Sequence, residues 1–174
     1  GTLRRAFSKS LSLELDRAAI LGSGSTPEPE GLANNASVPT TAVDATLDVD
    51  KVMDGYYSLL DNNVDPSKIS VLLNTRAWKE LQNDTFSDGR YKLSNGNAPG
   101  DWNKMKFLVT NQVPTTSGSP DSTKLFMGDF ADLVIAVRQE LQIDISTASA
   151  LAAWQSWVAG VIRADIGVLF PNSF

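Results

Sequence analysis

Apolar and polar residues alternate near the end of the chain, from Trp157 to Phe170. The even-numbered positions carry no polar side chain, whereas the odd-numbered positions include Arg163 and Asp165. Alternation with a period of two is typical of a β-strand with one buried face. At about 3.3 Å per residue the strand would span roughly 46 Å, which exceeds the diameter of about 40 Å expected for a compact chain of this length. The pattern therefore predicts a long strand in a flat, elongated molecule.

A helical pattern competes with this strand where the strand begins. Leu151, Trp154, Val158 and Val161 also recur at helical spacing. We interpret the segment as a short helix that ends near Trp154, followed by a strand that begins near Ser156.

The beginning of the chain has the pattern of an amphipathic helix over residues 3–21. Its apolar residues recur at helical spacing, at Leu3, Phe7, Leu11, Leu15 and Ala18. Gly22 then supplies a residue type that is common just after helices. Because no start signal precedes this pattern and no Met opens the chain, we expect the sequence to begin inside a helix and to be a piece of a longer protein.

The middle of the chain mixes helices and strands. Residues 22–41 are rich in Gly, Ser, Pro and Asn and predict a long loop. Asp48 can cap a second helix, and Asn74 or Thr75 can cap a short third helix that runs to Leu81. We expect strands at 69–73, 106–110, 124–127, 133–137 and 141–145, with turn-rich segments at 83–100 and 113–123. Because these elements do not alternate regularly, the predicted fold class is α+β.

The composition removes several kinds of chemistry. The 174 residues include neither His nor Cys, which excludes His-dependent triads, imidazole or thiolate metal sites, and disulfides. The net charge is −5 without a run of Lys or Arg, and sequence-independent nucleic-acid binding needs a basic face. The most apolar stretch, 148–162, is too short and too polar to span a bilayer, and no signal peptide is recognisable.

The motifs that could carry chemistry are better explained as turns. Gly22-Ser23-Gly24 follows a helix, whereas a dinucleotide-binding glycine loop follows a strand. The segment 84–95 lacks the third and twelfth ligands of a calcium loop, so we expect a turn closed by Asp88 and Gly89. The carboxylate pairs lack the apolar setting of a general acid. We therefore predict no catalytic, cofactor-binding or metal-binding residues.

Two tryptophans and one charged pair are candidate contact residues. Trp78 lies on the third predicted helix and is assigned to the core, whereas Trp102 lies in a turn-rich loop and is a candidate for an interface. Arg163 and Asp165 share one face of the long strand. They are either solvated or cross-strand charges, or they contact a neighbouring subunit.

Four short segments carry recognisable motifs, and the fourth of them leads on to Phe170, Pro171 and Phe174. The motif residues are Asp16, Gly22, Gly24, Pro29 and Gly31 in the first segment, Asn74, Trp78, Asp88, Gly89 and Arg90 in the second, Gly128, Asp129 and Phe130 in the third, and Arg163 and Asp165 in the fourth. In this order and spacing they resemble the major capsid proteins of tailed bacteriophages, the family with the Hong Kong ninety-seven type of shell fold. The segment just before Lys106 departs from the family pattern. The resemblance covers the C-terminal part of a family member.

The resemblance implies a structural protein and not an enzyme. It implies a peripheral lobe of residues 1–42 and 138–166, which includes the end of a spine helix, and an axial lobe of residues 43–137 and 167–174. The subunit would form pentamers and hexamers of itself in an icosahedral shell enclosing DNA. Assembly would take place in the bacterial host cytoplasm, and the product would be the virion capsid. No cofactor, small-molecule substrate, membrane or sequence-specific nucleic-acid contact is implied.

Three other functions are weighed against this one. An encapsulin-like compartment shell would carry a groove that loads cargo. A secreted, non-enzymatic ligand-binding α+β module would be a monomer with a defined pocket, and a carboxylate-dependent hydrolase needs two inward-facing acids at a fixed separation. For a shell protein, we expect segments 83–104 and 113–122 near the symmetry axes, with Trp102, Arg163 and Asp165 as inter-subunit residues.

Overall fold

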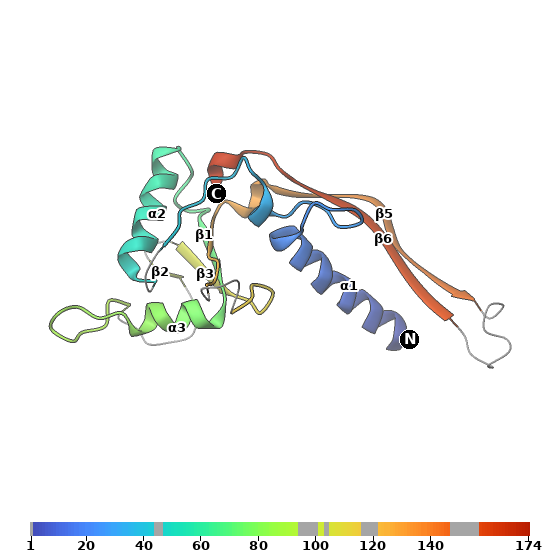
Figure 1. Cartoon of the computed structure of the whole chain (residues 1–174), viewed down its shortest axis with the longest axis horizontal. Helices are drawn as coiled ribbons and strands as arrows, with labels where there is room; N and C mark the ends of the chain where they lie inside the picture. Colours follow the sequence, from blue (N-terminus) through green and yellow to red (C-terminus); the bar gives the residue numbers. More distant parts are fainter. Residues whose placement is uncertain (1, 44–46, 94–100, 103–104, 116–121, 147–156) are drawn as a thin grey trace. The chain divides into compact units, whose positions relative to one another are not determined.

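The computed structural model describes residues 2–43, 47–93, 101–102, 105–115, 122–146 and 157–174 (Figure 1). The chain divides into two compact units, each built from segments that are far apart in the sequence. The helix–ribbon unit comprises Gly1–Asn34 and Val134–Gly167, and the sheet unit comprises Asn35–Leu133 and Val168–Phe174.

The helix–ribbon unit consists of one long helix and a two-stranded ribbon. Its elements are α1 (Thr2–Leu21), β5 (Leu133–Ser146) and β6 (Trp157–Val168). The two strands lie side by side and run in opposite directions (Figure 1). The helix packs closely on the ribbon at Gly160, where an added Cβ would lie 3.3 Å from Cδ1 of Phe7 and 3.5 Å from Cδ1 of Leu11. Glycine at this strand position therefore allows the close approach of the helix.

The predicted long strand is confirmed as β6, but it ends at Val168 and not at Phe170. The chain leaves the strand because Pro171 opens a short 3-10 helix, Pro171–Ser173, and proline has no N–H for a ladder hydrogen bond. Along β6, odd-numbered residues from 159 to 167 are exposed and even-numbered residues from 160 to 168 are half-buried. The short helix predicted before Ser156 lies outside the described residues.

The prediction of two strands at 133–137 and 141–145 is wrong, because β5 is continuous over both. The polar run Arg138-Gln139-Glu140 suggested a break. In the structure Arg138 and Glu140 are exposed while Gln139 is half-buried, so the run continues the strand's alternation and does not interrupt it.

The sheet unit has a four-stranded sheet in the order β2-β3-β1-β4. Its strands are β1 (Ser70–Leu73), β2 (Asp101–Trp102), β3 (Met105–Val109) and β4 (Phe126–Gly128). The central strand β1 pairs in parallel with β3 and antiparallel with β4, so that Val71 lies opposite both Phe107 and Met127. A parallel pair needs a crossover connection, and α3 (Thr75–Asn83) lies within it. Strand β2 was not predicted, since two residues show no periodicity.

Both predicted helix caps of the sheet unit are confirmed. Asp48 precedes α2 (Val49–Asp61), and its carboxylate accepts the N–H of Lys51 at 2.8 Å. Asn74 precedes α3, and its Oδ1 accepts the N–H of Ala77 at 2.9 Å. Each cap satisfies an N–H that has no partner within its own helix. In the helix–ribbon unit, the predicted loop after α1 includes a short 3-10 helix, Leu32–Asn34.

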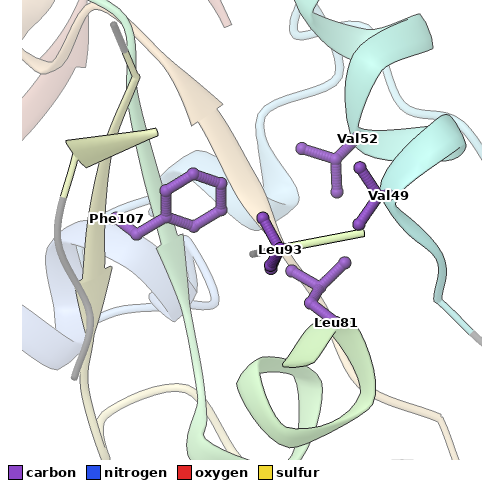
Figure 2. Close-up of a pocket in the computed structure, with 5 residues that line it drawn as sticks. All are labelled: Val49, Val52, Leu81, Leu93 and Phe107. Atoms are coloured by element: carbon purple, nitrogen blue, oxygen red, sulfur yellow. The ribbon is translucent and has the colours of Figure 1, made fainter. Parts of the chain in front are cut away.

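The sheet, α2 and α3 enclose an apolar core. Its largest fully buried apolar side chains are Ile69, Val71, Leu73, Leu81 and Met105. Figure 2 shows apolar side chains from the two helices, β3 and the intervening loop converging at Val49, Val52, Leu81, Leu93 and Phe107, and they leave no volume that a water molecule could occupy. Trp78 lies against this core, with its ring centroid 5.4 Å from that of Phe107, as predicted from its position on the third helix.

Candidate assembly surfaces

The first family-motif segment forms a glycine elbow, residues 22–31, which directly follows α1. The N–H of Gly31 donates to the carbonyl oxygen of Gly22 at 2.9 Å. An added Cβ at Gly22 would lie 2.2 Å from the carbonyl oxygen of Pro29, and one at Gly31 would lie 2.3 Å from the nitrogen of Gly22. These two glycines are required by close backbone approach, whereas Gly24 has the left-handed backbone, with φ +71°. Asp16 is exposed on the last turns of α1.

A cluster of charged residues fastens the elbow to α1. The guanidinium of Arg17 forms an ion pair with Glu28, and its Nε donates to Glu14 at 2.9 Å. Glu28 also accepts the N–H of Ser23 at 3.1 Å and the hydroxyl of Ser23 at 2.6 Å. Hydrogen bonds from Ser23, and then from Arg17, lower the pKa of Glu28 to about 2. Its carboxylate is therefore ionised at neutral pH and fixes the elbow.

The second motif segment begins with Asn74, which is fully buried. Besides capping α3, its Nδ2 donates to the carbonyl oxygen of Pro114 at 2.7 Å and to the hydroxyl of Thr123. One side chain thus ties the start of α3 to two segments about 40 and 49 residues further along the chain. Its role is to position the loops that follow β3.

The same segment ends in the predicted turn, which is confirmed. Gly89 has φ +81°, and its N–H donates to the carbonyl oxygen of Phe86 at 2.9 Å. Nε of Arg90 donates to Oδ2 of Asp88 at 2.6 Å. Phe86 and Tyr91 present exposed aromatic rings, so this turn is a candidate contact surface of the sheet unit.

The base of this turn is held by Lys92, which reaches two carboxylates. Its Nζ lies 2.8 Å from Oδ2 of Asp50 and 3.1 Å from Oδ2 of Asp84, and Asp84 also accepts the N–H of Val49 at 2.9 Å. Burial raises the pKa of Asp84, but the bonds from Val49 and Lys92 outweigh it, and the pKa lies below its usual value. Hydrogen bonds to Asp50 and Asp84 raise the pKa of Lys92. Both charges serve the fold and not a reaction.

The third motif segment, Gly128-Asp129-Phe130, receives the end of the chain. The N–H of Asp129 donates to the carbonyl oxygen of Ser173 at 3.0 Å. The rings of Phe130 and Phe174 meet edge to face, with centroids 5.5 Å apart. The carboxylate of Asp129 also accepts the N–H of Ala131 at 3.0 Å. The structure therefore joins the third motif to the residues that follow the fourth, a contact that sequence reasoning missed because no local pattern reports it.

The three predicted inter-subunit residues are placed to different degrees. Arg163 and Asp165 share the exposed face of β6, as their spacing predicted. The backbone of Trp102 pairs with Met105 between β2 and β3, but its side chain is outside the described structure. Exposed apolar residues were missed, among them four in succession from Val134 to Val137 in β5, where the lack of alternation was the available signal.

Within the described ranges, the ionisable side chains do not gather into a centre for chemistry. No group of three or more Asp or Glu residues is placed there to hold a metal ion. A depression of about 160 Å³ in the helix–ribbon unit is lined by Ser8, Leu11, Ser12, Leu15, Leu141 and Ile162. None of the described helices has the length and apolar character needed to cross a membrane.

Apolar and mixed-charge surfaces presented on rigid elements are features of a subunit that packs against other subunits. The model of the phage capsid family matches residues 1–174. The chain belongs to this family, which is structural in character, and the resemblance of the four motif segments is confirmed.

Solved capsid structures share the fold. The chain is 20% identical to the capsid of an empty GTA particle computed with C5 symmetry, with a TM-score of 0.72, covering 98% of this chain and 63% of that one. For the native GTA particle the values are 18%, 0.74, 98% and 62%, and for Gordonia phage Cozz 18%, 0.67, 97% and 59%. The chain thus spans about three fifths of each of these capsid chains. No curated protein gives a significant sequence match. The α+β capsid fold is confirmed.

Proposed function

We propose that this chain is part of a major capsid protein that assembles in many copies into a closed icosahedral shell around DNA. The observation that carries the proposal is the match of the capsid family to the whole chain. The similarity in fold to capsid chains from particles computed with C5 symmetry supports it. The shell would be the virion capsid, assembled in the cytoplasm of a bacterial host.

In this proposal the two compact units have different places in the shell. The helix–ribbon unit would be the peripheral lobe, and the sheet unit would be the axial lobe that meets its copies around five-fold and six-fold axes. Pentamers and hexamers of one subunit close a shell because each rotation returns to its starting point. The exposed turn with Phe86 and Tyr91 belongs to segment 83–104, which we place near the axes together with segment 113–122.

The proposed work of the protein is binding its own copies, without an enzymatic reaction. Its net charge of −5 is unsuited to a sequence-independent grip on DNA phosphates, so the DNA would be enclosed and not read. The described side chains with shifted pKa values, such as Glu28 and Asp84, hold loops in place, which accords with a structural protein.

Electron microscopy of the full gene product that contains this chain tests the proposal. Closed particles of uniform size that hold DNA after infection or induction are the expected result. Particles filled with a protein cargo would instead favour the encapsulin-like compartment. A product that stays monomeric at every concentration would contradict the shell function.

A further inference from the structure

The outer face of β6 carries four exposed residues in the order Val161, Arg163, Asp165 and Gly167. They share one face because successive side chains of a strand alternate between its two sides. The opposite face of the ribbon meets α1, where Ile162 and Leu141 line the depression beside the helix. Val161 is 41% exposed, and an added Cβ at Gly167 would meet nothing within 4 Å.

This face lacks internal charge partners among the residues that the structure describes. Arg163 forms no ion pair there, and the carboxylate of Asp165 only accepts the neighbouring N–H of Ile166 at 2.9 Å. A rigid strand therefore presents one cation and one anion on its surface, about 6.6 Å apart because two residues of a strand separate them.

The order of the four residues is complementary to itself in reverse. Two such strands that face each other antiparallel, with a two-fold axis passing between positions 163 and 165, bring each Arg163 opposite the partner's Asp165. The same register places each Val161 over the partner's Gly167, where the missing side chain leaves room for it. A surface that matches its own copy is what a two-fold contact requires, and both the charge and the size of these residues fit that symmetry.

We propose that the outer face of β6 binds the outer face of β6 in a second copy of this chain around a two-fold axis. This inference rests on the proposed function, since a shell supplies the second copy. A ribbon face about 40 Å long and about 10 Å wide offers roughly 400 Å² per copy, about half of what a stable pair buries. The contact is therefore weak alone and acts through its repetition in the shell.

Charge reversal and mixing test this contact. Arg163→Asp and Asp165→Arg each place like charges across the axis, so each variant alone should associate about threefold to fivefold more weakly than the unchanged chain. A mixture of the two variants restores opposite charges across the axis and should recover association as a mixed dimer, and so should the double variant. Sedimentation at high protein concentration measures the dimer, and the reversal of Lys79→Glu on α3 is the control.

Gly167→Val provides a second test, because it fills the space that the partner's Val161 would occupy. Val favours strands and meets open space here, so folding should be undiminished while dimerisation falls. No recovery on mixing, or equal losses with the Lys79 control, would overturn the two-fold contact. Closed particles from both single variants at normal yield would overturn it while the shell function stands. Recovery on mixing in a product that never forms particles would support the contact and contradict the shell.

Discussion

Gly128 is fixed by the residues that lie against it. Its φ is +157°, and an added Cβ would lie 2.3 Å from the carbonyl oxygen of Ser173 and 2.8 Å from Cα of Phe174. Both obstacles involve backbone atoms that hydrogen bonds hold in place, including the bond from the N–H of Asp129. The glycine of this motif is therefore explained by the docking of the last residues.

We expect Gly128→Ala to lower the free energy of unfolding by about 2–4 kcal/mol, because the added methyl group must push the docked segment away and strain the backbone. Urea denaturation measures the change. Gly167→Ala is the matched control, since its added Cβ meets nothing within 4 Å, and it should change stability by less than about 0.5 kcal/mol. Equal effects of the two substitutions would contradict the docking role of Gly128.

We expect Asn74→Ala to cost about 2–3 kcal/mol of unfolding free energy, because a helix cap is lost and the buried carbonyl of Pro114 loses its donor. Asn74→Asp separates the two roles, since it keeps the cap but cannot donate. The neighbouring Thr75→Ala is the control, because Thr75 is exposed and Ala favours helices. Thermal unfolding gives the order. An Asn74→Asp variant as stable as the unchanged chain would show that the donated bonds are unimportant.

Elements that depend on neighbouring residues could be predicted from the sequence. The helix periodicity of residues 3–21, the caps at Asp48 and Asn74, and the alternation of β6 each report contacts within one turn or one strand. These signals are local because a cap or an apolar stripe is set by residues three or four positions apart. They placed α1, α2, α3, β1, β3 and β6 close to their observed bounds.

Contacts between distant elements could not be predicted in this way. The bond from Asn74 to Pro114 and the docking of Ser173 on Asp129 join residues that share no periodic pattern. Strand β2 exists because β3 offers it a partner, and two residues carry no signal of their own. The four motif segments were recognisable as sequence, but the reasons for their residues, such as the close approach of Gly22 and Gly31, are visible only in three dimensions.

The elbow after α1 should weaken only in strong acid. The pKa of Glu28 is lowered from 4.5 to about 2, so its ion pair and hydrogen bonds contribute stability above about pH 4.5 that is lost as the pH falls towards 2. Glu28→Gln should therefore lower the melting temperature at pH 7, and the difference from the unchanged chain should shrink below pH 4.5.

Circular dichroism melts from pH 7 to pH 2 measure this difference. Glu30→Gln in the same elbow is the control, because Glu30 is exposed and its loss should leave the melting temperature nearly constant. A Glu28→Gln difference that persists unchanged at pH 2 would contradict a role for the ionised carboxylate.

At the scale of the whole molecule, the proposed place of segment 83–104 near the symmetry axes yields a prediction about assembly. Trp102→Ala in the full gene product should reduce the formation of pentamers and hexamers, since a large aromatic residue at a subunit contact carries much of its binding energy. Tyr57→Ala is the control, because Tyr57 is an exposed aromatic residue on α2 outside that segment.

Native mass spectrometry and electron microscopy report the yield of capsomers and particles, and circular dichroism checks that both variants fold. Normal capsomers from Trp102→Ala would remove this residue from the axial contacts. A loss of the same size in both variants would point to a general weakening and not to a contact at the axis.

The interleaving of the two compact units has a consequence for biosynthesis. A ribosome releases α1 first, yet the strands that cover its apolar face, β5 and β6, are made last. The sheet unit likewise waits for the residues that dock on Gly128 and Phe130. We expect neither unit to mature before translation has delivered the last strand, because partners so distant along the chain pair late. A nascent subunit would thus expose an unfinished surface until its synthesis ends, and chaperones would be most needed during that interval.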